Sequence, residues 1–178
     1  MHNLKTSHYL FHSFCIRPDY RFESQHPKEQ LILVLRAHPF TQLTWILNSI
    51  FFIIGLILLN FLFFNFLSAT QILFANLFGF SAIFAYIWFN FLGWYFNVGL
   101  ITNERIVDVD FHSVIYKEIT ETKLSKIEDV TAKSSGFFAS LFDYGNVFIQ
   151  TAGTEVNIEF IHIPKPSEVT KIINGLTI

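Results

Sequence analysis

The sequence has no Lys, Arg, Asp or Glu between Arg36 and Glu104, a gap of 67 residues. Water-soluble domains carry charges throughout their exposed surface, so a gap of this length excludes an ordinary soluble fold for this part of the chain. The gap holds 14 of the 23 Phe and all three Trp. A bilayer core about 30 Å thick takes roughly 20 helical residues per crossing, so the gap is long enough for two crossings. The missing charge predicts a membrane protein.

The chain also lacks disulfide pairs and enzyme motifs. Its single cysteine, Cys15, excludes an intramolecular disulfide. There is no Gly-rich phosphate loop, no HExxH, no CxxC and no GxSxG. His8 and His12 have the i, i+4 spacing of a metal pair, but no third ligand follows in register, and a solvated N-terminus explains them better. The sequence therefore predicts no enzyme, no cofactor and no metal site.

The uncharged region divides at a short polar segment, residues 68–71. The segments on either side, 43–67 and 72–93, are almost continuously apolar and are predicted to be transmembrane helices joined by this turn. The alternative is a pair of buried helices in a soluble protein, but too few residues remain to wrap two helices that are apolar on every face. Residues 1–42 are predicted to be a separate, partly flexible cytosolic segment.

Cations flank the predicted hairpin and indicate its orientation. Residues 1–36 carry five Lys or Arg against three acids, and Arg36 and Arg105 stand on either side of the spans. Cationic flanks are retained in the cytoplasm, and Trp45 and Trp94 fall near the same helix ends, where indole rings favour the interface. We therefore expect a protein of the inner membrane with both termini in the cytoplasm.

Two amides are expected to tie the spans together. A turn centred between Ala69 and Thr70 places Asn48 at the depth of Asn90. Two amides at one depth can pair by hydrogen bonds, whereas an unpaired amide in hydrocarbon is costly. The alternative is that each amide turns toward its own helix or toward the near interface.

After residue 96 the pattern changes to the alternation of half-buried strands. Five segments after the hairpin read as strands: 105–111, 114–122, 127–133, 146–151 and 155–161. Together with the residues just after 96 they predict about six antiparallel strands. Ser167 can cap a terminal helix with apolar residues at helical spacing: Val169, Ile172, Ile173 and Leu176. We expect this helix to cover one face of the sheet.

Four short motifs in this region occur in an order that carries a family resemblance: ITNERI at 101–106, LSKIEDV at 124–130, FDYGNV at 142–147 and IPKP at 163–166. With them, residues 94–178 resemble the bacterial pleckstrin-homology-like (PH-like), membrane-flanked (YdbS-like) domains. The resemblance implies a PH-like half-barrel capped by its C-terminal helix, and it implies no activity. The predicted fold is therefore an α+β membrane protein, a two-helix transmembrane hairpin followed by this half-barrel.

The family fold has seven strands, one more than the six predicted after the membrane. Residues 31–35, Leu-Ile-Leu-Val-Leu, lie on the same side as the domain and could supply an extra edge strand. The alternative is an interfacial segment that leads into the first span.

The charge of residues 94–178 disfavours anionic partners. Seven Lys or Arg face eleven Asp or Glu, so the clustered cations that hold nucleic acids or phosphate headgroups are missing. The phosphoinositide-binding members of the PH fold have basic residues around the first loop between strands. That loop is here 102–105, where Glu104 precedes Arg105. Anionic headgroup binding is therefore a second alternative, and nucleic acid is excluded.

An aromatic segment lies between Gly136 and Gly145. Its large side chains are too many to be all solvated on a loop: Phe137, Phe138, Leu141, Phe142 and Tyr144. One interpretation is a short helix or turn that closes the end of the barrel. The other is an exposed apolar patch that meets a partner or the membrane surface.

These features predict a non-enzymatic, membrane-anchored PH-like domain that acts as a protein-binding or assembly module. Its partner would be another protein or a second copy. The alternative is an accessory subunit of a transport or envelope-stress membrane complex, in which the hairpin and its Asn residues matter.

Overall fold

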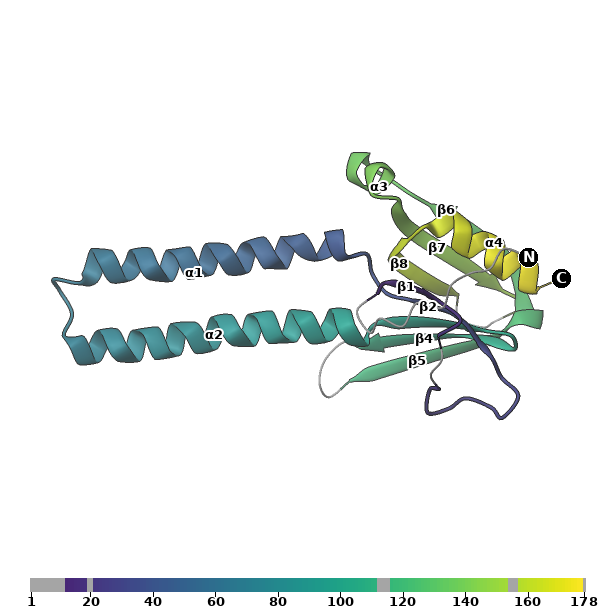
Figure 1. Ribbon diagram of the computed structural model, residues 1–178, viewed down its shortest axis with the longest axis horizontal. Helices are drawn as coiled ribbons and strands as arrows, with labels where there is room; N and C mark the ends of the chain where they lie inside the picture. The colour runs from purple at the N-terminus through teal and green to yellow at the C-terminus, as the bar shows by residue number, and fades with distance from the viewer. Residues whose placement is uncertain (1–11, 19–20, 112–115, 154–156, 178) are drawn as a thin grey trace. The chain divides into compact units, whose positions relative to one another are not determined.

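Two structural units make up the chain in the computed structural model, which describes residues 12–18, 21–111, 116–153 and 157–177. One unit joins Met1–Phe40 to Tyr95–Ile178, and the other is Thr41–Trp94. All the strands belong to the first unit, and most of the two long helices belong to the second (Figure 1).

The long helices are α1 (Leu43–Phe63), preceded by the short 3-10 helix η1 (Pro39–Gln42), and α2 (Ala69–Phe96). Both are long and apolar enough to cross a membrane. Ser49 is the only residue of the two helices that is buried, and the others are exposed or half-buried, as expected for helices whose surroundings are lipid. The two predicted apolar helices are confirmed.

The turn of the hairpin lies earlier than the sequence predicts. A turn is expected at 68–71, but α2 already begins at Ala69. Ser68 caps this helix: its backbone N–H donates to Oε1 of Gln71 at 2.9 Å, and its Oγ accepts from the N–H of Gln71 at 3.4 Å. This reciprocal capping box begins the helix at the polar residues, and the chain turns at 64–68 instead. The prediction was wrong because the residues of the turn are mostly apolar.

Two antiparallel sheets form the other unit. The first contains β1 (Phe14–Ile16), β2 (Leu31–Leu35), β3 (Val98–Thr102), β4 (Arg105–Phe111) and β5 (Lys117–Lys123) in that order. The second contains β6 (Ile127–Lys133), β7 (Tyr144–Thr151) and β8 (Ile158–Pro164). A 3-10 helix, η2 (Leu124–Lys126), joins the sheets, α3 (Phe137–Leu141) connects β6 to β7, and α4 (Pro166–Leu176) follows β8. The predicted α+β architecture, an antiparallel half-barrel with a C-terminal helix, is confirmed.

The hairpin interrupts the first sheet between β2 and β3. These strands pair antiparallel, with Leu35 opposite Gly99, and the side chains of Leu33 and Leu35 are fully buried. Of the two alternatives for residues 31–35, the structure shows the extra strand, which lies between β1 and β3 and not at an edge. The prediction of a separate N-terminal segment was wrong for residues 31–35, which belong to the domain. It failed because these residues pair with a strand on the other side of the hairpin, and a contiguous stretch of sequence does not show such a pairing.

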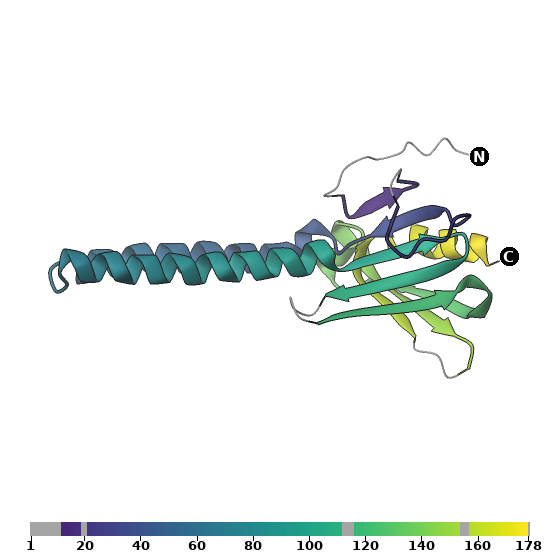
Figure 2. The same ribbon diagram turned by 90° about the horizontal axis from the view of Figure 1, so that it is seen from below.

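The core lies between the two sheets and is closed by α4. Leu33 and Ile106 of the first sheet are buried in one cluster with Ile149 of β7, and Val169 and Ile173 of α4 complete it. Figures 1 and 2 show α4, in yellow, beside the sheet of β6 and β7. The helix begins at Pro166, one residue before the predicted cap, because proline is well suited to the first helical position.

A second apolar cluster lies on the other face of the first sheet. Leu100 and Val107 are buried there with Cys15 of β1, which is only 2% exposed. The sequence analysis missed β1, because a three-residue strand is too short to show an alternating pattern. Since β1 pairs with β2, this N-terminal strand extends the sheet by one strand.

The alternation along β4 places its aspartates on the core side. Asp108 pairs with Gly99, and a Cβ at Gly99 would lie 2.5 Å from the ring of Phe160, which is a core residue. Paired residues of neighbouring strands share a face, so Asp108 faces the end of the core. Burial, followed by the repulsion of Asp110, raises the pKa of Asp108 from 3.8 to about 7.

Candidate binding surfaces

The short helix α3, which Figure 1 shows in the connection between β6 and β7, carries a cluster of exposed apolar side chains. Phe137 is 76% exposed, Phe138 55%, Leu141 62% and Phe142 41%. Only Ala139 of the helix is buried. The predicted short helix therefore forms, but its aromatic rings point outward instead of filling the end of the barrel.

Phe40 completes this surface, although the sequence analysis missed it. Its ring stacks on Phe142 with centroids 4.1 Å apart and lies 5.5 Å from Phe138. We call Phe40, Phe137, Phe138, Leu141 and Phe142 the aromatic patch. Tyr144, the other residue predicted for this surface, is only half-exposed and lies at the inner margin, with its ring 6.1 Å from that of Phe40.

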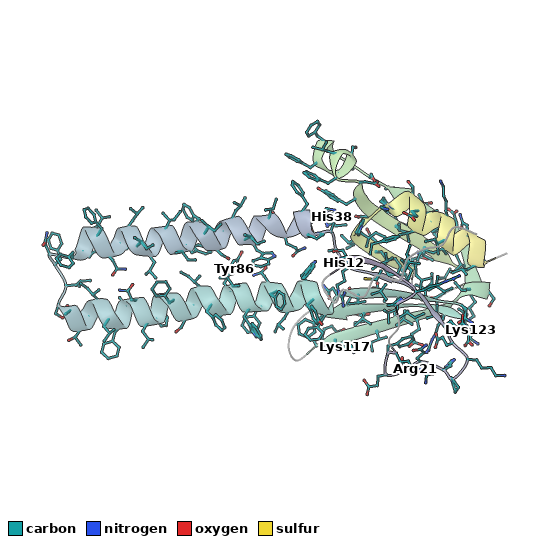
Figure 3. All side chains as sticks on the ribbon, viewed as in Figure 1. His12, Arg21, His38, Tyr86, Lys117 and Lys123 are labelled. Atoms are coloured by element: carbon teal, nitrogen blue, oxygen red, sulfur yellow. The ribbon has the colours of Figure 1, made fainter. Side chains whose placement is uncertain are left out.

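The residues that lead into α1 are fixed to the domain. His38 is labelled in Figure 3. Its N–H donates to the carbonyl oxygen of His162 at 2.7 Å, and its ring stacks on Tyr144. His162 itself is exposed, its backbone has φ 54°, and Ile163 takes the buried position. The bond from His38 joins the β2 side of the barrel to β8.

Arg36 binds both connections to the hairpin. Its side chain is 9% exposed, and its Nε donates to the carbonyl oxygen of Tyr95 at 3.1 Å in the last turn of α2. Its guanidinium lies 5.1 Å from the centroid of the Tyr95 ring. A cation near the carboxyl end of a helix is stabilised by the helix dipole. The cation that the sequence analysis used for orientation is thus also a structural anchor.

A buried ion pair lies at the opposite end of β4. Nε and Nη2 of Arg105 donate to the two carboxylate oxygens of Glu29 at 3.0 and 3.1 Å, and the Glu29 side chain is fully buried. Arg105 also binds Glu121 and the carbonyl oxygen of Ser24. Burial opposes ionisation of Glu29, but the hydrogen bonds from Arg105 and from the N–H of His26 outweigh it and lower its pKa.

Among the described residues, one group of side chains has ligand atoms close enough to hold a metal ion: His26, Glu29 and Glu104, within 4.8 Å of one another. Both Glu29 oxygens already accept hydrogen bonds from Arg105, so a cation would have to compete with the guanidinium. His26 Nδ1 lies 3.0 Å from Glu104. The geometry is that of an ion-pair network. His8 of the predicted histidine pair lies outside the described residues.

A hollow of about 210 Å³ next to this network gathers more basic groups than the sequence suggested. Its lining includes Arg105 and His26 together with Lys123 and Lys126, because η2 folds back beside the first loop of the sheet. Arg105 is already saturated by Glu29 and Glu121. The two exposed lysines that remain lack the clustered, bidentate grip that a multiply charged phosphate requires.

A row of apolar side chains crosses the first sheet and ends at β5, where its last member is exposed. Val98, Val109 and Ile119 are paired across β3, β4 and β5, so their side chains lie on one face. The first two are partly buried, whereas Ile119 is 51% exposed. Among the described strands β5 pairs with β4 alone, so its other side is an open edge. Lys117 and Lys123 mark the two ends of this edge (Figure 3).

Two side-chain amides form hydrogen bonds between the spans, but they are not the predicted pair. Nδ2 of Asn60 donates to Oδ1 of Asn76 at 2.7 Å, and the reverse bond is 2.8 Å. Asn90 donates to the carbonyl oxygen of Tyr86 in its own helix, and Asn48 is exposed. The earlier turn shifts the register of the hairpin, which brings a different pair of amides to one depth.

Comparison with known proteins places this architecture in a family. The family model described as "Bacterial PH domain" matches residues 40–177. The chain belongs to the bacterial PH domain family. The match begins after β2, so it does not include the strand that precedes the hairpin.

One solved structure resembles this bacterial PH domain protein. It is the crystal structure of a DUF1696 family protein with a pleckstrin-homology domain from Shewanella loihica PV-4. The sequence identity is 13%, the match covers 46% of this chain and 70% of that chain, and the TM-score is 0.37. No curated protein matches the chain.

The sequence held weak signals for the residues that the analysis missed. Phe40 is an aromatic residue three positions before the first span, where rings that contact an interface are common. Glu29 is an isolated acid directly before an apolar run. In both cases the partner is at least 76 residues away, so only the folded chain shows the contact.

Proposed function

We propose that this bacterial PH domain protein is a non-enzymatic, membrane-anchored docking module that binds a segment of another protein at the inner membrane. The observation that carries the proposal is the open β5 edge with the exposed side chain of Ile119 beside it. An extended peptide adds to such an edge through main-chain hydrogen bonds, and side chains such as Ile119 supply specificity. The charged residues along the edge, Lys117, Glu118 and Glu121 among them, discourage indiscriminate pairing.

The hairpin supports this function by holding the domain at the bilayer. Leu35 and Gly99 are paired, so the chain leaves and re-enters the domain at neighbouring points of one sheet. Arg36 and His38 fix the connecting residues to the domain. Docking at β5 would thus bring a partner to the membrane that holds the hairpin.

Photocrosslinking in native membranes tests the docking proposal. A benzoylphenylalanine placed at Ile119 in the full chain should give a discrete protein adduct. The same group at Gln150, which is exposed on the central strand β7, is the control, because a central strand has no open edge. Equal adducts at both positions, or none at Ile119, would contradict a docking edge at β5.

We further propose that the domain lies in the cytoplasm, on the basis of the cations that flank the hairpin. Single cysteines at Ala69 and at Gln150, in a Cys15→Ala background, would be exposed to an impermeant thiol reagent on intact cells. The reagent should label position 69 and spare position 150 until the cells are opened. The reverse labelling would overturn this orientation.

A second candidate function is an accessory subunit of a transport or envelope-stress membrane complex. The observation that favours it is Asn48, an amide exposed on α1 inside a helix that can cross a membrane. An amide in hydrocarbon gains by pairing with a polar group of another helix. If this is its role, Asn48→Leu should release a co-purifying membrane protein, whereas Ile119→Lys should leave that protein bound.

A further inference from the structure

We infer that the aromatic patch is a membrane-seating surface, held in the interfacial layer of the bilayer that the hairpin crosses. Four of its five side chains are between 41% and 76% exposed, and Phe137 is the most exposed of them. Contiguous apolar surface of this kind marks a site of contact with a partner or a membrane. The inference goes beyond docking at β5 and does not depend on it.

The chain itself keeps the patch close to the bilayer. Phe40 belongs to the patch through its stack on Phe142, and α1 begins three residues later, at Leu43. Successive Cα atoms are 3.8 Å apart, so the Cα of Phe40 is at most about 11 Å from the first residue of α1. The polar interface extends roughly 5–8 Å beyond each side of the hydrocarbon core. A surface tethered at this distance reaches the interface.

The chemistry of the patch fits lipid better than a charged ligand. Residues 134–142 contain no charged residue, and Lys133 and Asp143 lie just outside them. Phe and Leu side chains gain from the carbonyl and acyl region of the interface, where aromatic residues gather in membrane proteins. A surface without charge gives a contact that does not need anionic headgroups and does not weaken with salt.

The backbone around α3 makes the side chains of the aromatic patch project from the domain. Gly136, with φ 100°, turns the chain out of β6, and Ala139 is the only buried residue of the short helix. The rings of Phe137 and Phe138 pack edge to face with centroids 5.6 Å apart, and this contact stabilises their orientation. Four of the five apolar side chains therefore project from the β6–β7 connection, and Phe40 of η1 packs against them.

Spin labels on the full chain test this inference. In a Cys15→Ala background, a single cysteine replaces Leu141 or, as the control, Gln150, which is exposed six residues along β7 from Tyr144. The labelled proteins are reconstituted in vesicles of phosphatidylcholine. We expect the label at 141 to collide more often with oxygen, which concentrates in lipid, than with a water-soluble nickel complex. The label at 150 should show the opposite preference.

A charge substitution gives the matched comparison. Phe138→Glu should move the label at 141 toward the nickel complex, whereas Gln150→Glu should leave it unchanged. Circular dichroism of each variant verifies that the fold persists. A label at 141 that is as accessible to nickel as the label at 150 would overturn the inference. So would a photocrosslinker at Phe137 that yields a protein adduct in native membranes and no lipid adduct.

Discussion

At the scale of single residues, the ion pair of Glu29 and Arg105 connects the segment before β2 to β4. A buried pair is weak evidence for stability as a whole, but removing one partner leaves an uncompensated charge. We predict that Glu29→Ala lowers the free energy of unfolding by about 3 kcal/mol. The measurement is denaturant unfolding of the detergent-purified chain, followed by labelling of the buried thiol of Cys15.

The matched control is Glu121→Ala, which removes the more exposed partner of Arg105. This change should lower stability by about 1 kcal/mol or less, since exposed pairs contribute little. The lowered pKa of Glu29 means that its contribution is present above the ordinary Glu range and is lost as the pH falls through the lowered pKa. Equal losses in the two variants would show that burial is not what matters.

Asp108 gives a prediction of the opposite sign. Its pKa is raised to about 7, so the folded protein holds a proton that the unfolded chain releases above pH 3.8. Stability therefore falls as the pH rises from about 4 to 7 and then levels off. We expect Asp108→Asn to stabilise the protein at pH 8 and to have little effect at pH 4. A difference between the two proteins that is independent of pH would contradict the raised pKa.

At the scale of elements, the reciprocal hydrogen bonds between the side-chain amides of Asn60 and Asn76 set the register of the hairpin. Each Nδ2 of Asn60 and Asn76 also donates to a carbonyl oxygen of its own helix, so both amides are satisfied in the membrane. Measured interhelical bonds contribute about 0.6 kcal/mol on average and at most about 1.7 kcal/mol. We predict a coupling energy in this range between Asn60→Leu and Asn76→Leu in a double-mutant cycle of thermal stability in detergent.

The control for this cycle is the pair Asn48→Leu and Asn90→Leu. These changes should be additive, because Asn90 bonds within α2 and Asn48 is exposed. Coupling in this pair, with strict additivity at 60 and 76, would favour the register first predicted from the sequence.

The elements were predictable where one pattern decides them. Missing charge identified both long helices, and alternation identified β4 to within a residue. The turn was misplaced because apolarity alone does not distinguish a turn in lipid from a span. The exposure of the α3 rings was left open because their sequence fits a buried plug and a projecting patch equally well. In the structure, the small Ala139 is the only residue of α3 that is buried.

At the scale of the whole molecule, the hairpin divides one domain in sequence but not in structure. Residues 96–178 alone would lack Leu33 and Leu35, which are fully buried in the core, and would leave β3 as a bare edge. We predict that this fragment aggregates when expressed alone. A chain that links residues 12–36 through a short Gly-Asn turn to residues 98–178 should be soluble and monomeric by size exclusion. Its amide NMR spectrum should be dispersed.

The matched comparison for this excision is the same linked chain with Leu33→Asp. A charge at this buried position should return the chain to aggregation, because an isolated ion has no partner in the core. If residues 96–178 fold without β2, the strand is an accessory and not part of the barrel.

The split domain also explains where sequence-based prediction stops. The composition after the hairpin gave six strands and the terminal helix, and the family fold required a seventh. Leu31–Leu35 was available, but its pairing with β3 connects residues on opposite sides of the hairpin. Nothing local distinguishes such a strand from an apolar lead into a span. The buried contacts of Arg36 and Glu29 are hidden for the same reason.

The interrupted sheet has a consequence for how the protein is made. β2 leaves the ribosome before either long helix, and its partner β3 follows only after both have been synthesised. β2 therefore stays unpaired while the hairpin enters the bilayer, and a failed insertion would keep it separated from β3. Completion of the barrel therefore reports that the hairpin has crossed and returned. Chains that fail this step would display an open, apolar sheet edge to the proteases and chaperones of the cell.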